Sequence, residues 1–361
     1  MDIANNRAET AGNQSTACDP AIANNVLKEY GIVPDSVSVI QGGSIKTVWK
    51  VSSGGVPYCL KRLKHTIDKA LFSVNAQVHV KNSGGLVPGV YPNMHGEPIT
   101  QYNGQLFVLY EWIAGKDLNF NVPADLRMAV RGLAKFHLAS KGYQAVEGAR
   151  VSTKLGKWPD QYTSMSRKLT AWKELAEGSY PSPALSAYLQ HVDRMLALAD
   201  KALAALDGSD YKKLTEQGGT NGSKKPSDQV SDRIVLCHQD YGKGNALAVG
   251  SSVYVLDLDG VTYDLPARDL RKIIGKNAER HNRWSAEAIS EILGWYTEIN
   301  PMGAEEMEVL YADLLFPHWF YGLVKNLFQN GKALKASEIE KTALLESSKE
   351  EALRLCFKRS D

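Results

Sequence analysis

Oxygen-bearing side chains near residues 240 and 257 have the types and the spacing of a phosphoryl-transfer site. Asp240 is followed by Asn245 five residues later and by Asp257 twelve residues after that. An aspartate beside a substrate hydroxyl can accept its proton, and amide and carboxylate oxygens are hard ligands that hold Mg2+ against nucleotide phosphates. These residues therefore predict phosphoryl transfer from a nucleotide, with Asp240 as base and the other two as metal ligands.

Apolar, strand-like runs precede both clusters and would position them. Residues 234–237 lead into the loop that carries Asp240, and residues 253–256 read as a strand that ends at Asp257. The gap of twelve residues after Asn245 fits a short β-hairpin with its turn at 250–252. The hairpin would deliver Asp257 to the same end of the strands as the loop.

Two other motifs share the letters Asp257-Leu258-Asp259-Gly260. In haloacid-dehalogenase-like phosphatases the first aspartate of such a motif is a nucleophile, but there the motif lies near the start of a Rossmann-like core. Here only about a hundred residues follow, and they read as helical. An EF-hand would need a glutamate at position 268, which is Arg268. We therefore favour the metal and phosphate interpretation over both.

The part of the chain before residue 114 reads as a small sheet with one helix. Strand composition occurs at 37–40, 47–51, 58–61 and 106–110, and Gly54-Gly55 supplies a hairpin turn. Between these strands, apolar residues recur at helical spacing over residues 66–81. Most of 120–206 and 265–356 reads as helices instead, so a β-rich lobe is followed by a helical lobe.

Two features of the β-rich part could bind phosphates. The glycines in Gly42-Gly43 have no Cβ, so their backbone N–H groups could approach a phosphate closely, although two glycines between strands also form ordinary hairpins. Lys61 alternates with Cys59, so its ammonium could lie on the sheet face under that turn and contact the α- and β-phosphates. A surface lysine is the plain alternative.

The segment 110–115 leaves a strand and enters a loop where the β-rich part gives way to helices. Such a connector exposes backbone N–H and C=O groups that can pair with the edge of an adenine ring. We assign Glu111 and Ile113 to this role. An interdomain linker is a compatible interpretation, because a nucleotide in a cleft between lobes must touch the linker.

Over roughly residues 25–355, the chain resembles the aminoglycoside phosphotransferase and choline kinase superfamily, and within it the CotS-type spore coat proteins. The general marks are Gly42-Gly43, Lys61, His238-x-Asp240 with Asn245, and Leu256-Asp257. Longer marks of the subfamily lie at 70–73, 153–158, 237–242 and 257–271.

This resemblance implies an α+β, bilobal protein-kinase-like fold with ATP in the interlobe cleft and a small-molecule acceptor over the helical lobe. It implies Asp240 as catalytic base, Asn245 and Asp257 as Mg2+ ligands, and Asp269 as a carboxylate that braces the catalytic loop. His238 and Asp259 are supporting residues, Asp259 as a second-metal or loop-bracing group. The resemblance also implies association with the spore coat and with other coat proteins.

One position departs from the superfamily, which carries an acid on the first-lobe helix to pair with the phosphate-binding lysine. The matching residue here is Val78, while Gln77 points about 100° away around a helix and Asp68 is roughly three turns away. Lys61 is therefore expected to lack its usual ion partner. Two functions stay open: a Mg-ATP-dependent phosphotransferase for a small hydroxyl or amino compound, or a weak or inactive structural coat protein that still binds nucleotide.

The composition is typical of a globular protein. The 361 residues are 43% hydrophobic and 23% charged, which is globular usage for two or three domains or lobes. A net charge of +2 provides no strong field for nucleic acid or an acidic membrane surface. The four cysteines are far apart, without zinc or disulfide spacing, and are expected to be reduced thiols. No apolar stretch approaches the length of a membrane-spanning helix.

The expected organisation has three parts. Residues 1–24 form a flexible tail, 25–113 the nucleotide-binding lobe and 114–361 the helical lobe, with a flexible loop at 207–232. The first twenty residues lack the basic start and apolar core of a secretory signal, so we expect synthesis in the cytoplasm without a signal peptide.

Overall fold

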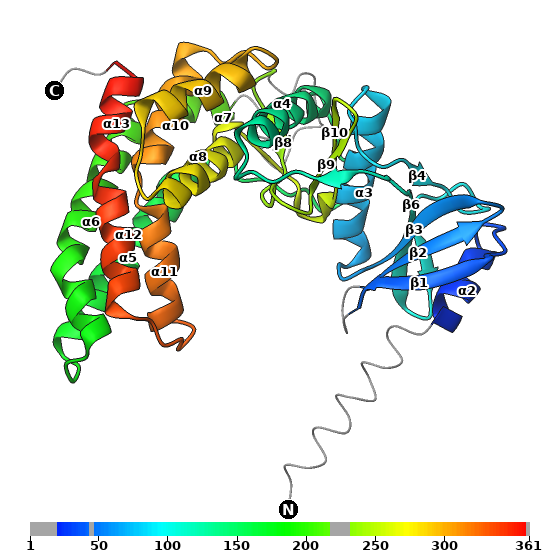
Figure 1. The fold of residues 1–361 in the computed structure, drawn as a ribbon, viewed down its shortest axis with the longest axis horizontal. Helices are drawn as coiled ribbons and strands as arrows, with labels where there is room; N and C mark the ends of the chain where they lie inside the picture. The colour runs from blue at the N-terminus through cyan, green and yellow to red at the C-terminus, as the bar shows by residue number, and fades with distance from the viewer. Residues whose placement is uncertain (1–19, 43–46, 217–231, 359–361) are drawn as a thin grey trace, which may run out of the picture. The chain divides into compact units, whose positions relative to one another are not determined.

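The computed structural model describes residues 20–42, 47–216 and 232–358, which form two compact units (Figure 1). The sheet unit comprises the described residues of 1–118, 143–152 and 243–261, and the helical unit those of 119–142, 153–242 and 262–361. Both units are discontinuous in sequence, unlike the single division after residue 113 that we expected. The hairpin that carries Asn245 and Asp257 belongs to the sheet unit.

An antiparallel sheet with the order β1-β2-β3-β6-β4 dominates the sheet unit, and β5 also pairs with β6. Its strands are β1 (Ser36–Gln41), β2 (Thr47–Ser53), β3 (Val56–Leu63), β4 (Val90–Tyr91), β5 (Thr100–Tyr102) and β6 (Gln105–Glu111). Gly54 and Gly55, with φ of 57° and 77°, form the turn between β2 and β3. The expected strands are therefore confirmed. The structure adds β4 and β5, which are too short to give a strand pattern in the sequence.

Both faces of this sheet are covered, which explains why β6 is apolar at successive positions. Side chains alternate between the faces of a strand. Phe107 and Leu109 pack in one cluster with Ala23 and Leu27 of α2 (Pro20–Lys28). Leu106, Val108 and Tyr110 point to the opposite face and pack in a second cluster with α3 (Ile67–Asn82). Helix α2 begins at Pro20, where we expected the flexible tail to continue to residue 24.

A second, small sheet in the same unit has the order β10-β9-β7. It consists of β7 (Lys116–Asp117), β9 (Ala246–Val249) and β10 (Ser252–Val255). The predicted hairpin is confirmed: Ala246 pairs with Val255, and the turn contains Gly250 at φ 60°. The short 3-10 helix η1 (Leu258–Gly260) follows β10 and packs on α3.

The helical unit contains a two-stranded sheet and ten helices among its described residues. Strand β8 (Val235–Cys237) pairs with β11 (Thr262–Asp264). The helices are α4 (Pro123–Ser140), α5 (Trp158–Glu177), α6 (Pro183–Asp207), α7 (Tyr211–Glu216), α8 (Ala267–His281), α9 (Ala286–Thr297), α10 (Ala304–Leu315), α11 (His318–Phe328), α12 (Ala336–Ser347) and α13 (Lys349–Cys356).

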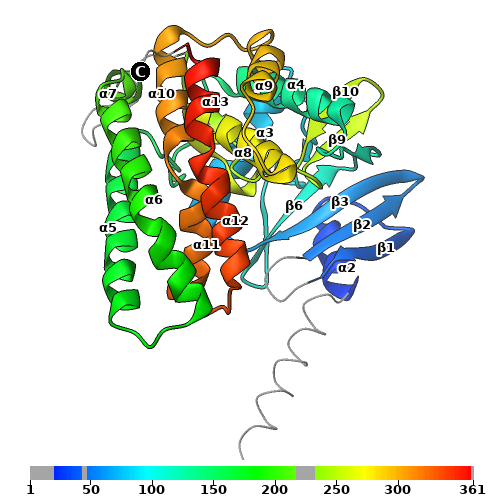
Figure 2. The ribbon, with the colours of Figure 1, turned by 60° about the vertical axis from the view of Figure 1, so that its left-hand side comes forward.

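Long amphipathic helices build the core of this unit. Helix α6 packs against α5, α10 and α12, and Figure 2 shows α5 and α6 side by side. Tyr188 and Met195 of α6 are completely buried, as the helical spacing of its apolar residues predicts. Helix α7 occupies part of 207–232, where we expected a loop; residues 217–231 lie outside the described residues.

Two further expectations concern membranes and thiols. Within the described ranges, no helix has both the length and the apolar character needed to cross a bilayer. Cys59, Cys237 and Cys356 are thiols rather than disulfide partners, as expected from their spacing, and Cys18 lies outside the described residues.

Gly115 marks the closest approach of the connector to β9. A Cβ built on it would lie 2.9 Å from the carbonyl oxygen of Ala248 and 3.0 Å from Cβ of Leu247. Because this overpacks backbone rather than a flexible side chain, we expect Gly115→Ala to lower the free energy of unfolding by about 1–3 kcal/mol. Chemical denaturation measures the change.

Gly294 provides the matched control. It lies within helix α9, and a Cβ there meets nothing within 4 Å. Gly294→Ala should therefore be neutral or stabilise the protein by up to about 1 kcal/mol. Equal effects of the two substitutions would contradict the close approach at Gly115.

Candidate active site

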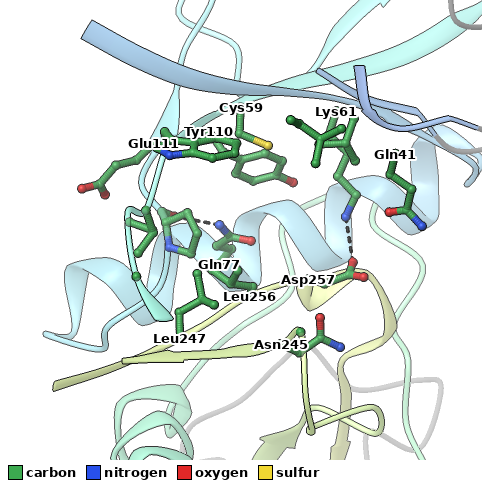
Figure 3. Close-up of a pocket in the computed structure, with 17 residues that line it drawn as sticks. Gln41, Cys59, Lys61, Gln77, Tyr110, Glu111, Asn245, Leu247, Leu256 and Asp257 are labelled. Atoms are coloured by element: carbon green, nitrogen blue, oxygen red, sulfur yellow. Dashed lines mark hydrogen bonds and ion pairs between the residues drawn. The ribbon is translucent and has the colours of Figure 1, made fainter. Parts of the chain in front are cut away.

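A cavity of about 370 Å³ opens in the sheet unit between the sheet, α3 and the β9–β10 hairpin (Figure 3). This volume lies within the range of small-molecule sites, which are mostly apolar with a few placed polar groups. Lys61, Asn245 and Asp257 gather at one end, and Glu111 and Leu247 lie toward the other. The lining residues are Ile40, Gln41, Val48, Cys59, Lys61, Gln77, Pro88, Tyr110, Glu111, Trp112, Ile113, Gly115, Gly244, Asn245, Leu247, Leu256 and Asp257.

Lys61 is held at the polar end by two carboxylates. The alternation of β3 places Lys61 on the same face as Cys59, and both line the cavity. Its Nζ donates hydrogen bonds to Oδ1 of Asp257 at 2.8 Å and to Oδ1 of Asp259 at 2.6 Å. Burial alone would lower the pKa of this lysine, but the charges of Asp259 and Asp257 outweigh burial and raise it above its ordinary value. Lys61 is therefore a fixed cation.

The two predicted metal ligands lie at the open end of the β9–β10 hairpin. Asn245 immediately precedes β9, and Asp257 comes two residues after β10. The backbone N–H of Leu256 donates to the carbonyl oxygen of Asn245 at 3.0 Å, which continues the pairing of the two strands past their ends. Register thus brings an amide and a carboxylate to one edge of the cavity, where oxygen ligands suit a hard cation such as Mg2+.

The backbone of Asp257 is in the left-handed region, with φ 60° and ψ 62°. This conformation is uncommon for residues other than glycine, although aspartate tolerates it better than most. It turns the chain directly from β10 into η1, which carries Asp259 back toward Lys61. The bend therefore lets two aspartates that are two positions apart reach one ammonium.

The connector after β6 borders the other part of the cavity. Glu111 ends β6, and its carboxylate accepts hydrogen bonds from Nζ of Lys81 at 2.9 Å and from the backbone N–H of Gly89 at 3.0 Å. Burial alone would raise the pKa of Glu111, but these two donors outweigh it and lower the pKa. The side chain is thus engaged elsewhere, and Ile113 lines the cavity just beyond the end of the strand.

The glycine turn is only partly described. Gly42 is exposed and is not among the residues that line the cavity, whereas Gln41 before it is. Gly43 lies outside the described residues. The phosphate-binding role expected of this turn therefore stays a prediction.

The helical unit holds the loop that contains Asp240. This loop begins with His238 after β8, and Gln239 has a left-handed φ of 67°. Asp269 braces the turn: its Oδ2 accepts from the backbone N–H of His238 at 2.6 Å, and its Oδ1 from that of Gln239 at 2.9 Å. Farther along, the hydroxyl of Tyr241 donates to the carbonyl oxygen of Ala129 at 2.7 Å.

Asp269 is 1% exposed and remains ionised. Burial alone would raise its pKa, but the hydrogen bonds from His137 and from the backbone N–H of Gln239 help to outweigh burial and lower the pKa to about 2. Asp269 Oδ2 lies 3.2 Å from Nε2 of His137, whose Nδ1 lies 2.7 Å from the hydroxyl of Tyr296. Cys237 is also close enough to complete a metal-binding trio with these residues. The hydrogen bonds already made indicate a structural cluster instead.

Asp240 itself is exposed, and its backbone N–H lies 3.3 Å from Nδ1 of the buried His238. It belongs to the helical unit, whereas Asn245 and Asp257 belong to the sheet unit. Four residues of the chain, 241–244, lie between Asp240 and Asn245. The structure thus places Lys61, Asn245 and Asp257 in the sheet unit and the loop with Asp240 in the helical unit.

The first-lobe helix offers Lys61 no acidic side chain. Gln77, not Val78, faces the cavity, and its Nε2 donates to the carbonyl oxygen of Pro88 at 2.7 Å. Lys61 lacks its usual partner on this helix, as expected, but Asp257 and Asp259 are ion partners that the sequence did not indicate. The sequence could not reveal this pairing, since nearly two hundred residues separate the lysine from its partners.

Sequence reasoning also missed several apolar lining residues, among them Tyr110, Leu247 and Leu256. Leu247 and Leu256 flank the hairpin positions already selected for their oxygens, so the hairpin register could have identified them. Tyr110 ends the apolar run of β6 and is buried like its neighbours. Nothing in its sequence context distinguishes it from the core.

Comparison with known proteins gives consistent results. Residues 36–305 match the model of a family described as the phosphotransferase enzyme family. The chain is 27% identical over 300 residues to Spore coat protein S of Bacillus subtilis (strain 168), covering 83% of this chain and 82% of that protein.

Solved structures show the same fold at low identity. An aminoglycoside phosphotransferase from Alicyclobacillus acidocaldarius has a TM-score of 0.71 at 17% identity and covers 93% of this chain and 94% of its own. A microcompartment-associated aminopropanol kinase has a TM-score of 0.57 at 18% identity over 93% of this chain and 97% of its own. The amicoumacin kinase hAmiN, solved with AMP-PNP, Ca2+ and Ami, has a TM-score of 0.57 at 14% identity over 92% and 94%. The expected kinase-like α+β fold is confirmed.

Asp269 allows a test of the braced loop. Asp269→Asn leaves two backbone N–H groups without an ionised acceptor, so we expect the free energy of unfolding to fall by about 2–4 kcal/mol at pH 7. Chemical denaturation measures the loss. Asp210→Asn, at an exposed carboxylate near Lys213, is the control and should change stability by less than about 0.5 kcal/mol.

The same variant predicts a pH dependence. Because the folded pKa of Asp269 is about 2, below the ordinary 3.8, its ionisation stabilises the fold above pH 3.8 and loses this effect as the pH falls toward 2. The difference between wild type and Asp269→Asn should be constant from about pH 5 to 8 and shrink by about 2 kcal/mol below about pH 4. A difference that changes between pH 5 and 8 would contradict the assignment.

Proposed function

Because this chain belongs to the phosphotransferase enzyme family, we propose that it is a Mg2+- and ATP-dependent phosphotransferase that acts on a small hydroxyl or amino compound in association with the spore coat. The observation that carries the proposal is the polar end of the cavity. There a fixed cation, Lys61, lies with Asn245 and Asp257 in a pocket whose lining is mostly apolar.

The cavity matches the two chemical halves of a nucleotide. Its apolar side, with Val48, Leu247 and Leu256, offers apolar contact surface for a base. Backbone groups of Glu111 and Ile113 in the connector would pair with the edge of adenine. At the other end, Lys61 would neutralise the α- and β-phosphates.

Asn245 and Asp257 fit a hard divalent cation because both supply oxygen at one hairpin end. They would hold Mg2+, which when bound neutralises charge on the β- and γ-phosphates. The solved relatives support nucleotide use: hAmiN was solved with AMP-PNP and Ca2+, and another relative is an aminopropanol kinase.

Asp240 would orient the acceptor and take the proton of its hydroxyl or amino group as the phosphoryl group is transferred. Such a base contributes about 10^2- to 10^4-fold in rate. Asp269 positions it, because its bonds to the N–H groups of the two preceding residues fix the loop that presents Asp240.

The inactive structural alternative rested on a lysine without its usual acidic partner on the first-lobe helix. The usual acid on the helix is absent, but Asp257 and Asp259 hold Lys61 in its place, so we favour the enzyme over the structural alternative. Similarity to Spore coat protein S supports association with the spore coat, where other coat proteins would be its partners.

Asp240→Asn separates binding from chemistry. The substitution keeps the shape of the side chain but removes its proton-accepting charge, so we expect unchanged nucleotide-dependent thermal shift and a loss of turnover of about 10^2- to 10^4-fold. Turnover is measured as ADP release with Mg-ATP across a panel of alcohols, amines and aminoglycosides. Asp210→Asn serves as the control with wild-type rates.

The panel also decides the proposal as a whole. Wild-type protein that shows no nucleotide-dependent shift with Mg2+ would overturn the ATP assignment. A coat protein without catalysis would be favoured if wild type binds nucleotide but no acceptor on the panel makes it release ADP faster than Asp240→Asn does.

Asp257→Asn tests the metal ligands. We expect it to remove most of the Mg2+-dependent part of nucleotide binding, with affinity for Mg-ATP about tenfold or more weaker, because a charged ligand becomes neutral. Affinity measured with chelator in place of Mg2+ should change much less. Calorimetry with and without Mg2+ provides both values, and Asp68→Asn is the control. Equal losses in the two conditions would contradict a metal role.

A further inference from the structure

The partner of Lys61 lies somewhere the sequence did not indicate. The buried face of α3 presents Ala70, Ser73, Val74 and Gln77, and none of them is acidic. Asp68 is the acid of this helix, but it lies in the first turn, where the hydroxyl of Thr66 donates to its carboxylate. Helix α3 therefore supplies no counter-ion for the buried lysine.

We propose that Asp259 is a positioning residue that replaces the helix acid: it is the counter-ion that fixes Lys61, and it leaves Asp257 for the metal. This inference rests on the proposed function, because Lys61 is fixed for the purpose of meeting nucleotide phosphates. It assigns Asp259 one role, in place of the second-metal or loop-bracing roles that the sequence allowed.

The geometry distinguishes the two aspartates. Asp259 Oδ1 lies 2.6 Å from Nζ of Lys61, and Asp257 Oδ1 lies 2.8 Å from it. The side chain of Asp259 is 13% exposed and that of Asp257 30%. Asp257 lines the cavity, whereas Asp259 is absent from its lining. The less exposed carboxylate of Asp259 thus contacts the lysine outside the cavity lining, and that of Asp257 lines the space that the phosphates and metal would take.

Local structure keeps Asp259 in this place. It is the middle residue of η1, and Leu258 before it is 2% exposed. The backbone N–H of Val261 closes the turn by donating to the carbonyl oxygen of Leu258 at 3.2 Å. Because η1 packs on α3, the helix still helps to position Lys61, but through packing rather than through a charge.

Two aspartates are needed because Lys61 and a divalent cation each require a carboxylate. A carboxylate that ligates a divalent cation cannot at the same time neutralise a lysine at full strength. With Asp259 present, Asp257 can turn to the metal while Lys61 keeps a buried counter-ion. Without Asp259, Lys61 and the metal would compete for the single carboxylate of Asp257, so both lysine position and metal affinity would suffer.

A double-mutant cycle between Asp259 and Lys61 tests this role. Mg-ATP affinity is measured by calorimetry for wild type, Asp259→Asn, Lys61→Met and the double variant. If Asp259 acts through Lys61, Asp259→Asn should weaken binding about tenfold in wild type but less than about twofold in the Lys61→Met background. Asp259→Glu should recover part of the affinity, and Asp68→Asn should leave it unchanged.

A second measurement does not depend on nucleotide. Thermal unfolding of the same four proteins in chelator should show a lower midpoint for Asp259→Asn than for wild type. The midpoints of Lys61→Met and the double variant should differ by less, because the ion pair is already lost in both. This cycle is informative even where Lys61→Met binds nucleotide too weakly for calorimetry.

The outcomes separate this inference from the proposed function. An equal loss of Mg-ATP affinity on Asp259→Asn in both backgrounds would make Asp259 a metal ligand and overturn the positioning role, while the phosphotransferase proposal stands. Additive midpoint shifts in the unfolding cycle would also overturn it. Wild-type protein that binds no nucleotide would overturn both.

Discussion

The ion pairs of Lys61 with Asp257 and Asp259 are the interaction on which the candidate site depends. They join the third strand of the sheet to the segment after the β9–β10 hairpin, so the fold must bring together residues nearly two hundred positions apart. A buried ammonium would be costly without compensating charge. The cavity walls, the hairpin and η1 are therefore arranged around a single cation.

Both functional loops use backbone conformations that most side chains avoid. Asp257 in the sheet unit and Gln239 in the helical unit have positive φ, and each directly adjoins a predicted site residue or is one. Such conformations persist only where the surroundings hold them. Lys61 anchors the first loop and Asp269 the second, so a buried charge stabilises each bend. A buried charge thus orients both the carboxylate of Asp257 and the loop that carries Asp240.

Much of this was predictable because it is local. The strands before Asp240 and Asp257, the hairpin turn at Gly250 and the helix over residues 66–81 follow from periodicity and turn chemistry, and the structure confirms them. Local sequence patterns did not predict the features that depend on tertiary packing. Gln77 rather than Val78 faces the cavity because of how α3 is rotated on the sheet, and α7 forms in a polar segment without apolar periodicity.

The sequence by itself determined which oxygen-bearing side chains one hairpin and one loop present, since residue types and spacings within such a local element survive any packing. It selected Asn245 and Asp257, which hairpin register then placed at one edge of the cavity. Only the tertiary structure decided how charge is distributed. Lys61 finds its counter-ions on η1 and its neighbour rather than on α3, because a pairing across the chain depends on distances that no local pattern records.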